Sequence, residues 1–122
     1  MKNEILSFSK IQKSPHLIEE GLNKVLVLGQ YKFATQHESK SGRLVLSLFI
    51  DPKAPSKVKA KVFRDQNVEG LQQQINVFFS KSGAKMKYFT QSGGGNTIIA
   101  VVYYEEDKVP ATTDPTTQSQ NS

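Results

Sequence analysis

The chain has 122 residues and a formal net charge of +5, and it contains no cysteine and no tryptophan. A chain of this length builds one domain with its own core, and without cysteine it holds neither a disulfide framework nor a thiolate metal site. Its longest apolar runs are far shorter than the ~20 residues that cross a bilayer, and its first residues lack the apolar stretch of a signal peptide. We therefore expect a cytoplasmic protein that does not enter a membrane.

The positive charge is unevenly distributed along the chain. Residues 105–122 hold four acidic side chains and one lysine, so the excess of basic side chains lies in residues 1–104. A basic domain favours polyanionic partners such as nucleic acid, although a solvated lysine-rich surface is the simpler alternative. The last residues are polar and rich in Thr, Ser, Gln and Pro, and we expect residues 106–122 to form a disordered tail that is available to other proteins.

The first half of the chain predicts a strand, a helix and two further strands. Ser14 followed by Pro15 is typical of a helix start, and an apolar stripe at helical spacing follows. Gly29 fits the left-handed position at the end of this helix. The last strand of this half is apolar on both faces and should be central in its sheet. The predicted ranges are 3–11 for the first strand, 15–28 for the helix, and 31–36 and 43–51 for a hairpin.

The second half repeats this order after a break at Pro52 and Pro55. Lysine alternates with apolar residues at its start, which indicates a strand with one wet, positive face. Asp65 or Asn67 can cap the next helix, and Gly83 ends it. Three consecutive glycines in the final turn allow positive φ angles. The predicted ranges are 57–63 for the strand, up to residue 80 for the helix, and 85–91 and 96–105 for the closing hairpin.

Two short motifs occur twice in the same order, which indicates an internal duplication. Glu20-Gly21-Leu22 corresponds to Glu69-Gly70-Leu71. Lys32-Phe33-Ala34-Thr35-Gln36 corresponds to Lys87-Tyr88-Phe89-Thr90-Gln91. Two copies of one unit normally pack about a pseudo-twofold axis and build a shared surface.

These observations predict an α+β fold made of two β-α-β-β units. The units cover residues 3–51 and 56–105, and together they form a single globular domain over residues 1–105. We expect one mixed, mainly antiparallel sheet of six strands with both helices on one face.

The face of this sheet without helices is the candidate binding surface. Lysines at alternating positions of residues 57–63 share one face, and two lysines of the strand at 85–91 should line up there with an aromatic ring. Lysines neutralise phosphates, and aromatic rings stack bases with about 1–3 kcal/mol each. The predicted nucleic-acid-binding residues are Lys32, Arg43, Lys57, Lys59, Lys61, Lys85, Lys87 and Phe89. Further stacking candidates are Tyr31, Phe33, Tyr88 and Tyr103, although large rings are also the usual core-filling groups.

Catalysis has little support in the sequence. His16 and His37 have no serine or carboxylate at a spacing typical of a charge relay, and the acidic residues form no metal-ligand pattern. The glycine-rich turn matches neither a P-loop nor a dinucleotide fingerprint, and we interpret it as a hairpin tip. We therefore predict a protein that is not an enzyme and uses no cofactor and no metal.

The function that we favour from the sequence is non-enzymatic binding of single-stranded DNA or RNA with low sequence specificity. The alternative is a protein-interaction or assembly module, as in bacterial or phage accessory proteins, which uses the same face or an edge strand and forms homo-oligomers. A small-ligand site in the cleft between the two copies is a third hypothesis. Salt separates the first two, because phosphate binding weakens steeply with rising salt and apolar assembly does not.

Overall fold

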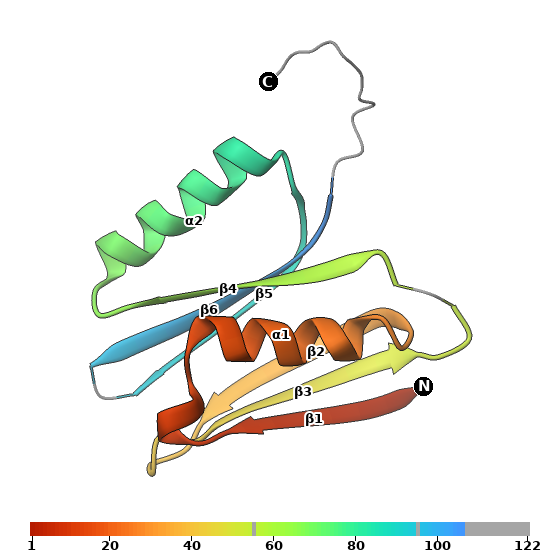
Figure 1. The fold of residues 1–122 in the computed structure, drawn as a ribbon, viewed down its shortest axis with the longest axis horizontal. Helices are drawn as coiled ribbons and strands as arrows, with labels where there is room; N and C mark the ends of the chain where they lie inside the picture. The colour runs from red at the N-terminus through yellow and green to blue at the C-terminus, as the bar shows by residue number, and fades with distance from the viewer. Residues whose placement is uncertain (55, 95, 107–122) are drawn as a thin grey trace.

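The computed structural model describes residues 1–54, 56–94 and 96–106, and Figure 1 shows their arrangement. They form an α+β structure with two helices and two three-stranded antiparallel sheets. From residue 107 onward, the predicted tail lies outside the described residues. In the described part of the chain, no helix is long and apolar enough to cross a membrane.

The elements follow the predicted order, strand, helix, strand, strand, in each half of the chain. In the first half they are β1 (Lys2–Phe8), the short 3-10 helix η1 (Lys10–Gln12), α1 (Pro15–Leu26), β2 (Gln30–Glu38) and β3 (Leu44–Asp51). In the second half they are β4 (Val58–Asp65), α2 (Val68–Ser82), β5 (Lys85–Gly94) and β6 (Thr97–Glu105). The first strand ends earlier than predicted because the chain enters η1.

Both helices begin at residues whose side chains accept a backbone hydrogen bond. The Oγ atom of Ser14 accepts from the backbone N–H of Leu17 at 3.2 Å. The Oδ1 atom of Asn67 accepts from the backbone N–H of Gly70 at 2.7 Å. Each bond satisfies one of the donors that a helix start leaves without a partner, so both predicted starts are confirmed.

The two glycines predicted to end the helices play different roles. Gly83 ends α2 with a φ of 66°, in the left-handed region, as predicted. The prediction for Gly29 is wrong, because α1 ends at Leu26 and Gly29 has no positive φ. A Cβ atom at Gly29 would lie 2.5 Å from the carbonyl oxygen of Asp51. This glycine therefore permits two backbone segments to approach closely.

Two separate sheets replace the single mixed sheet that the sequence predicts. The strand order is β1-β3-β2 in the first sheet and β4-β6-β5 in the second, and all neighbours are antiparallel. The central place of β3 is confirmed. Buried and partly exposed residues alternate along β3, however, so only one of its faces is buried.

The two helices pack on opposite faces of the second sheet, which corrects the prediction that they share one face. On β6, Val101 and Tyr103 point into the larger core cluster, which also contains side chains of α1 and of the first sheet. Ala100 and Val102 point the other way, into a smaller cluster with Leu71 of α2. The helix α1 therefore lies between the two sheets, and α2 covers the outer face of the second (Figure 1).

The helix α1 also covers the outer edge of β4. Asn23 donates from Nδ2 to the carbonyl oxygen of Ala60 at 3.2 Å and accepts at Oδ1 from the N–H of Ala60 at 2.8 Å. Glu19 accepts from the N–H of Val62 at 2.9 Å. These side chains satisfy backbone groups that an edge strand otherwise exposes.

The two sheets meet where β2 contacts β5, and we call this contact the seam. The rings of Tyr31 and Tyr88 lie 6.1 Å apart, and farther along the strands Gln36 donates to the Oγ atom of Ser92 at 2.8 Å. The partner of the later residue in β2 is also the later residue in β5, so β2 and β5 run in the same direction. Gln36 also donates to the carbonyl oxygen of Ile99 at 3.0 Å and accepts from the hydroxyl of Thr90 at 2.7 Å.

Candidate nucleic-acid interface

Each strand of the seam carries a β-bulge, at Lys32 in β2 and at Lys87 in β5. The extra residue of a bulge is left out of the ladder, and the bulge re-aims its side chain. Lys32 and Lys87 line one pocket with a volume of about 550 Å³, together with Lys57 from the segment before β4. We call it the seam pocket. Its other lining residues are Gln30, Tyr31, Ser56, Val58 and Glu105.

The seam pocket has a surplus of positive charge. Its three lysines face a single carboxylate, that of Glu105. The Nζ atom of Lys87 lies 3.9 Å from this carboxylate, and both side chains are more than one-third exposed, so the pair is weak. Within the described residues, Lys32 and Lys57 form no ion pair. The pocket is therefore suited to an anion.

An aromatic side chain lies directly beside the seam pocket. Phe33 follows Lys32 in β2, is 46% exposed, and has its ring centroid 5.4 Å from that of Tyr88. Tyr31 stacks at 5.2 Å on Tyr103, which is fully buried. Of the five rings proposed from the sequence, Phe33 is the exposed one.

Exposed side chains continue from this ring along β2. Phe33, Thr35 and His37 alternate with inward-facing residues such as Ala34, so they share the face of the first sheet that points away from α1. At about 3.3 Å per residue, the stretch from Phe33 to His37 runs for roughly 13 Å.

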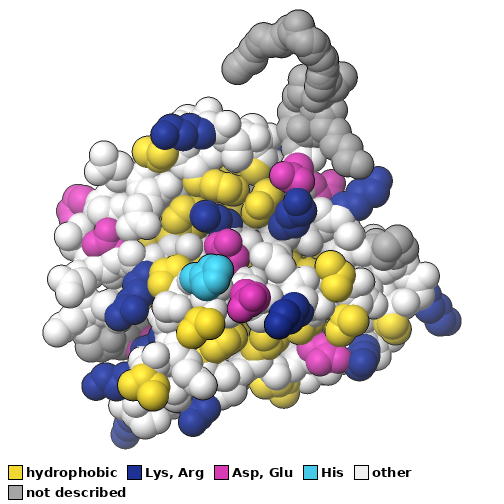
Figure 2. All heavy atoms as spheres, viewed as in Figure 1, with side chains coloured by type: hydrophobic (Ala, Val, Ile, Leu, Met, Phe, Trp, Pro, Cys, Tyr) yellow, Lys and Arg dark blue, Asp and Glu magenta, His cyan; other side chains and the backbone are white. Residues whose placement is uncertain are grey.

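The two hairpin turns meet at the other end of the seam. Lys40 and Gly42 of the first turn and Asn96 of the second line a pocket with a volume of about 620 Å³, which we call the turn pocket. Basic side chains also gather at this end of the molecule, at the lower left of Figure 2. The seam therefore connects two basic pockets.

Lys59 and Lys61 do not lie on a helix-free face as predicted. They pair with Tyr104 and Val102 in β6, whose side chains point into the cluster under α2. The Nζ atom of Lys59 lies 2.7 Å from Glu106, and this hydrogen bond raises the pKa of Lys59. Lys61 lies 3.8 Å from the carboxylate of Glu19. Both lysines face carboxylates of the chain itself.

Lys85 and Phe89 lie on opposite faces of β5, although strict alternation predicts one face for both. The bulge at Lys87 shifts the register, so that Lys85 pairs with Glu105 and Phe89 with Val102. Phe89 packs in the cluster under α2 and offers little of its ring to solvent.

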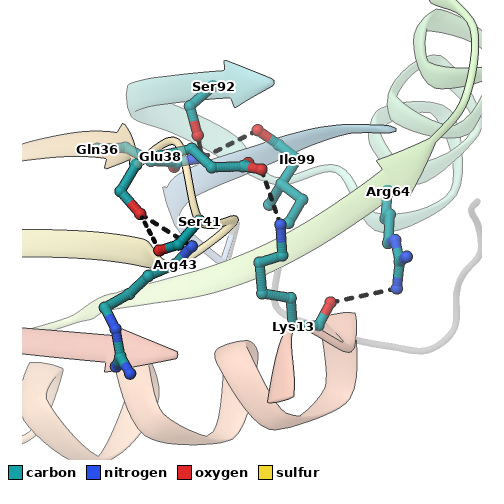
Figure 3. Close-up of polar contacts among 9 residues, drawn as sticks. Lys13, Gln36, Glu38, Ser41, Arg43, Arg64, Ser92 and Ile99 are labelled. Carbon is teal, nitrogen blue, oxygen red and sulfur yellow. Dashed lines mark hydrogen bonds and ion pairs between the residues drawn. The ribbon is translucent and has the colours of Figure 1, made fainter. Parts of the chain in front are cut away.

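Arg43 lines neither pocket. Its Nη1 atom donates to the Oγ atom of Ser7 at 2.8 Å, and its guanidinium points away from the turn pocket (Figure 3). The structure thus brings together Lys32, Lys57 and Lys87, with Tyr31 in the same pocket, whereas Arg43, Lys59, Lys61, Lys85 and Phe89 do not line it.

The sequence reasoning missed the buried ion pair of the turn pocket. Lys13 and Glu38 lie 2.8 Å apart, with side chains that are only 7% and 5% exposed. They are far apart in the sequence and belong to no motif. The only feature of the sequence that pointed to this place was the expectation that the two hairpin turns correspond to each other.

In residues 1–54, 56–94 and 96–106, no group of three or more histidine or acidic side chains could hold a metal ion. Comparison of the chain with protein-family models, with curated proteins and with solved structures found no match. A function is therefore argued from the geometry of the chain itself.

Proposed function

We propose that the protein binds single-stranded nucleic acid at the seam pocket and along the exposed side of β2, and that it does so without catalysis. The observation that carries this proposal is the convergence of Lys32, Lys57 and Lys87 from three distant segments into one pocket. Like charges that converge repel one another, and a bound polyanion offsets this repulsion. Lysines that only keep a surface solvated do not have to converge in one pocket.

The chemistry of the surface fits a single strand with little sequence preference. The lysines neutralise phosphates, which carry no information about the bases. Phe33 offers a ring on which any base stacks. Beyond it, Thr35 and His37 offer polar groups along the same side of β2.

The internal duplication belongs to this proposal, because it makes Lys32 and Lys87 equivalent contacts. Three features support a duplicated β-α-β-β unit: the repeated element order, the same edge-centre-edge order in both sheets, and bulges at the corresponding lysines. Each unit then contributes one bulged lysine to the seam pocket.

The experiment is fluorescence anisotropy of a labelled oligothymidylate titrated with a charge-reversed double variant, Lys32→Glu with Lys87→Glu. We expect at least about a tenfold loss of affinity, since two phosphate contacts become repulsive. The matched control reverses Lys24 and Lys81, exposed lysines on α1 and α2 that line neither basic pocket. An equal loss in both double variants would show that only net charge matters and would refute the proposal.

Phe33→Ala tests the stacking contact separately. Loss of one base stack should weaken binding by about five- to 150-fold, which corresponds to about 1–3 kcal/mol. Ile5→Ala is the control, because Ile5 is an exposed apolar residue on the same face of the first sheet. If both substitutions leave the affinity unchanged, no base stacks on this face.

One observation favours a second function, self-assembly or docking of a protein. Ile5, Phe33 and Phe49 are 64%, 46% and 37% exposed and share the face of the first sheet that points away from α1. Apolar association through this face should persist at high salt, whereas nucleic-acid binding should not. Sedimentation at low and high salt separates the two functions.

A further inference from the structure

The turn pocket lies where η1, the β2–β3 turn, the end of β4 and the β5–β6 turn come together. Its volume of about 620 Å³ is within the range of small-molecule sites. It lies at the opposite end of β2 from the seam pocket. The residues that line it are Lys10, Lys13, Glu38, Ser39, Lys40, Ser41, Gly42, Arg64, Asn96 and Thr97.

Three of the basic side chains of the turn pocket are available to an anion. Lys13 is neutralised by Glu38, whereas Lys10, Lys40 and Arg64 are exposed and pair with no carboxylate in the described part of the chain. Arg64 donates from Nη1 to the carbonyl oxygen of Lys13 at 3.3 Å, which fixes its position (Figure 3). A phosphate monoester, with a charge of about −1.5 to −2 at neutral pH, matches this set of cations.

The wall of the pocket also contains a buried hydrogen-bond acceptor. Lys13 donates to Oε2 of Glu38 at 2.8 Å, but Oε1 of Glu38 is buried and has no hydrogen-bond partner in the described residues. The side chain of Glu38 is 5% exposed, so it is more than nine-tenths buried. An unpaired buried acceptor is destabilising, and a ligand whose N–H group reaches this oxygen would satisfy it.

The first turn is closed by hydrogen bonds and carries two hydroxyl groups. The hydroxyl groups of Ser39 and Ser41 lie 2.9 Å apart, and the N–H of Arg43 donates to Ser39 at 3.1 Å. Gly42 has a φ of 86°, which closes the turn against the stem of Lys10. Ser39 and Ser41 line the same pocket as the cations that would hold a phosphate.

From these features we propose that the turn pocket binds a nucleoside 5′-monophosphate. The phosphate lies among Lys10, Lys40 and Arg64, and an N–H group of the base donates to Oε1 of Glu38. The ligand is a free nucleotide or the phosphorylated end of a strand, since both present the same group. This site is separate from the seam pocket and does not depend on strand binding there.

Isothermal titration calorimetry with AMP and GMP tests this assignment, with ribose 5-phosphate and inorganic phosphate as truncated probes. We expect both nucleotides to bind at least about tenfold more tightly than ribose 5-phosphate, because the base adds an N–H donor for Glu38 that the sugar phosphate lacks. Lys10→Gln with Lys40→Gln should weaken nucleotide binding at least about tenfold, since two charge-assisted contacts are lost.

The matched control is Lys24→Gln with Lys81→Gln, which removes the same charge from exposed lysines that line neither basic pocket and should leave nucleotide binding unchanged. Both double variants alter exposed side chains and should fold normally. Absence of binding at millimolar nucleotide, or equal binding of inorganic phosphate and nucleotides, would overturn the assignment. So would nucleotide binding that is unchanged in the variant of Lys10 and Lys40.

A second titration distinguishes the two sources of the ligand. Oligonucleotides with a 5′-phosphate and with a 5′-hydroxyl group are compared by anisotropy. A preference for the phosphate that the Lys10 and Lys40 variant removes would assign the pocket to strand ends. Equal affinity for both, together with calorimetric binding of AMP or GMP, would assign it to free nucleotides.

Discussion

Tyr31 holds its hydroxyl group in the seam without a hydrogen-bond partner. The oxygen is buried, and no donor or acceptor of the described residues reaches it. Burial raises the pKa of this hydroxyl, and the neighbouring Tyr103 and Tyr88 raise it further. The ring contributes by stacking on Tyr103, so the hydroxyl itself is expected to add nothing to stability.

Tyr31→Phe should therefore leave the free energy of unfolding at neutral pH unchanged or raise it by up to about 1 kcal/mol. The folded protein holds this proton more tightly than the unfolded chain does. Titration of this group therefore leaves the folding stability unchanged below the unfolded pKa of about 10 and lowers it as the pH rises above that value. Urea unfolding should show a smaller alkaline loss of stability in the variant. A loss of more than about 2 kcal/mol at neutral pH would mean that the hydroxyl has a partner.

At the residue scale, the sequence predicts what depends on neighbours in the chain. Ser14, Asn67 and Gly83 act within one helical turn of their own positions; Ser14 and Gly83 were predicted correctly, and Asn67 was one of the two caps that the sequence offered. Gly29 was misassigned because a side chain there would clash with the backbone of Asp51, which is far away in the sequence.

Between elements, Gln36 joins the two sheets through three hydrogen bonds. Its partners are the side chains of Thr90 and Ser92 and the carbonyl oxygen of Ile99, all in the second sheet. Gln36→Ala should lower the free energy of unfolding by about 2–4 kcal/mol, since three polar groups lose their partner. Thermal or urea unfolding measures the effect.

The corresponding residue of the second motif, Gln91, supplies a matched control. It is exposed, and its side chain makes no hydrogen bond within the described residues. Gln91→Ala should change the stability by less than about 0.5 kcal/mol. Similar effects of the two substitutions would contradict the role given to Gln36.

The edge of β4 depends on α1 in a similar way. Asn23→Ala removes both hydrogen bonds to Ala60 and should cost about 1–3 kcal/mol of stability. Asn76→Ala, on the exposed side of α2, carries the same change in helix propensity without those bonds. The difference between the two variants measures the edge contact, and a difference near zero would refute it.

At the element scale, alternation predicted which residues of β4 share a face, but it failed on β5. The bulge at Lys87 inserts one residue, and every side chain before it changes face relative to those after it. Lys85 and Phe89 were therefore placed together wrongly. The sequence carries no separate signal for a bulge at this position.

For the whole molecule, the sequence predicted the class and the order of elements but not the packing of the two halves. Periodicity shows that a face is apolar, and it does not show which element will cover it. The helix-free face of the second sheet packs against α1, so it is core and not binding surface. The convergence of Lys32, Lys57 and Lys87 depends on the seam, which no local pattern encodes.

The most direct measurement is the salt dependence of single-strand affinity, as the slope of log K against log salt concentration. Three phosphate contacts predict a slope of about −2, because each contact contributes about −0.7 on a single strand. Lys32→Gln with Lys87→Gln should bring the slope to about −0.7. A slope near zero, or a steep slope that the substitutions leave unchanged, would contradict strand binding at the seam pocket.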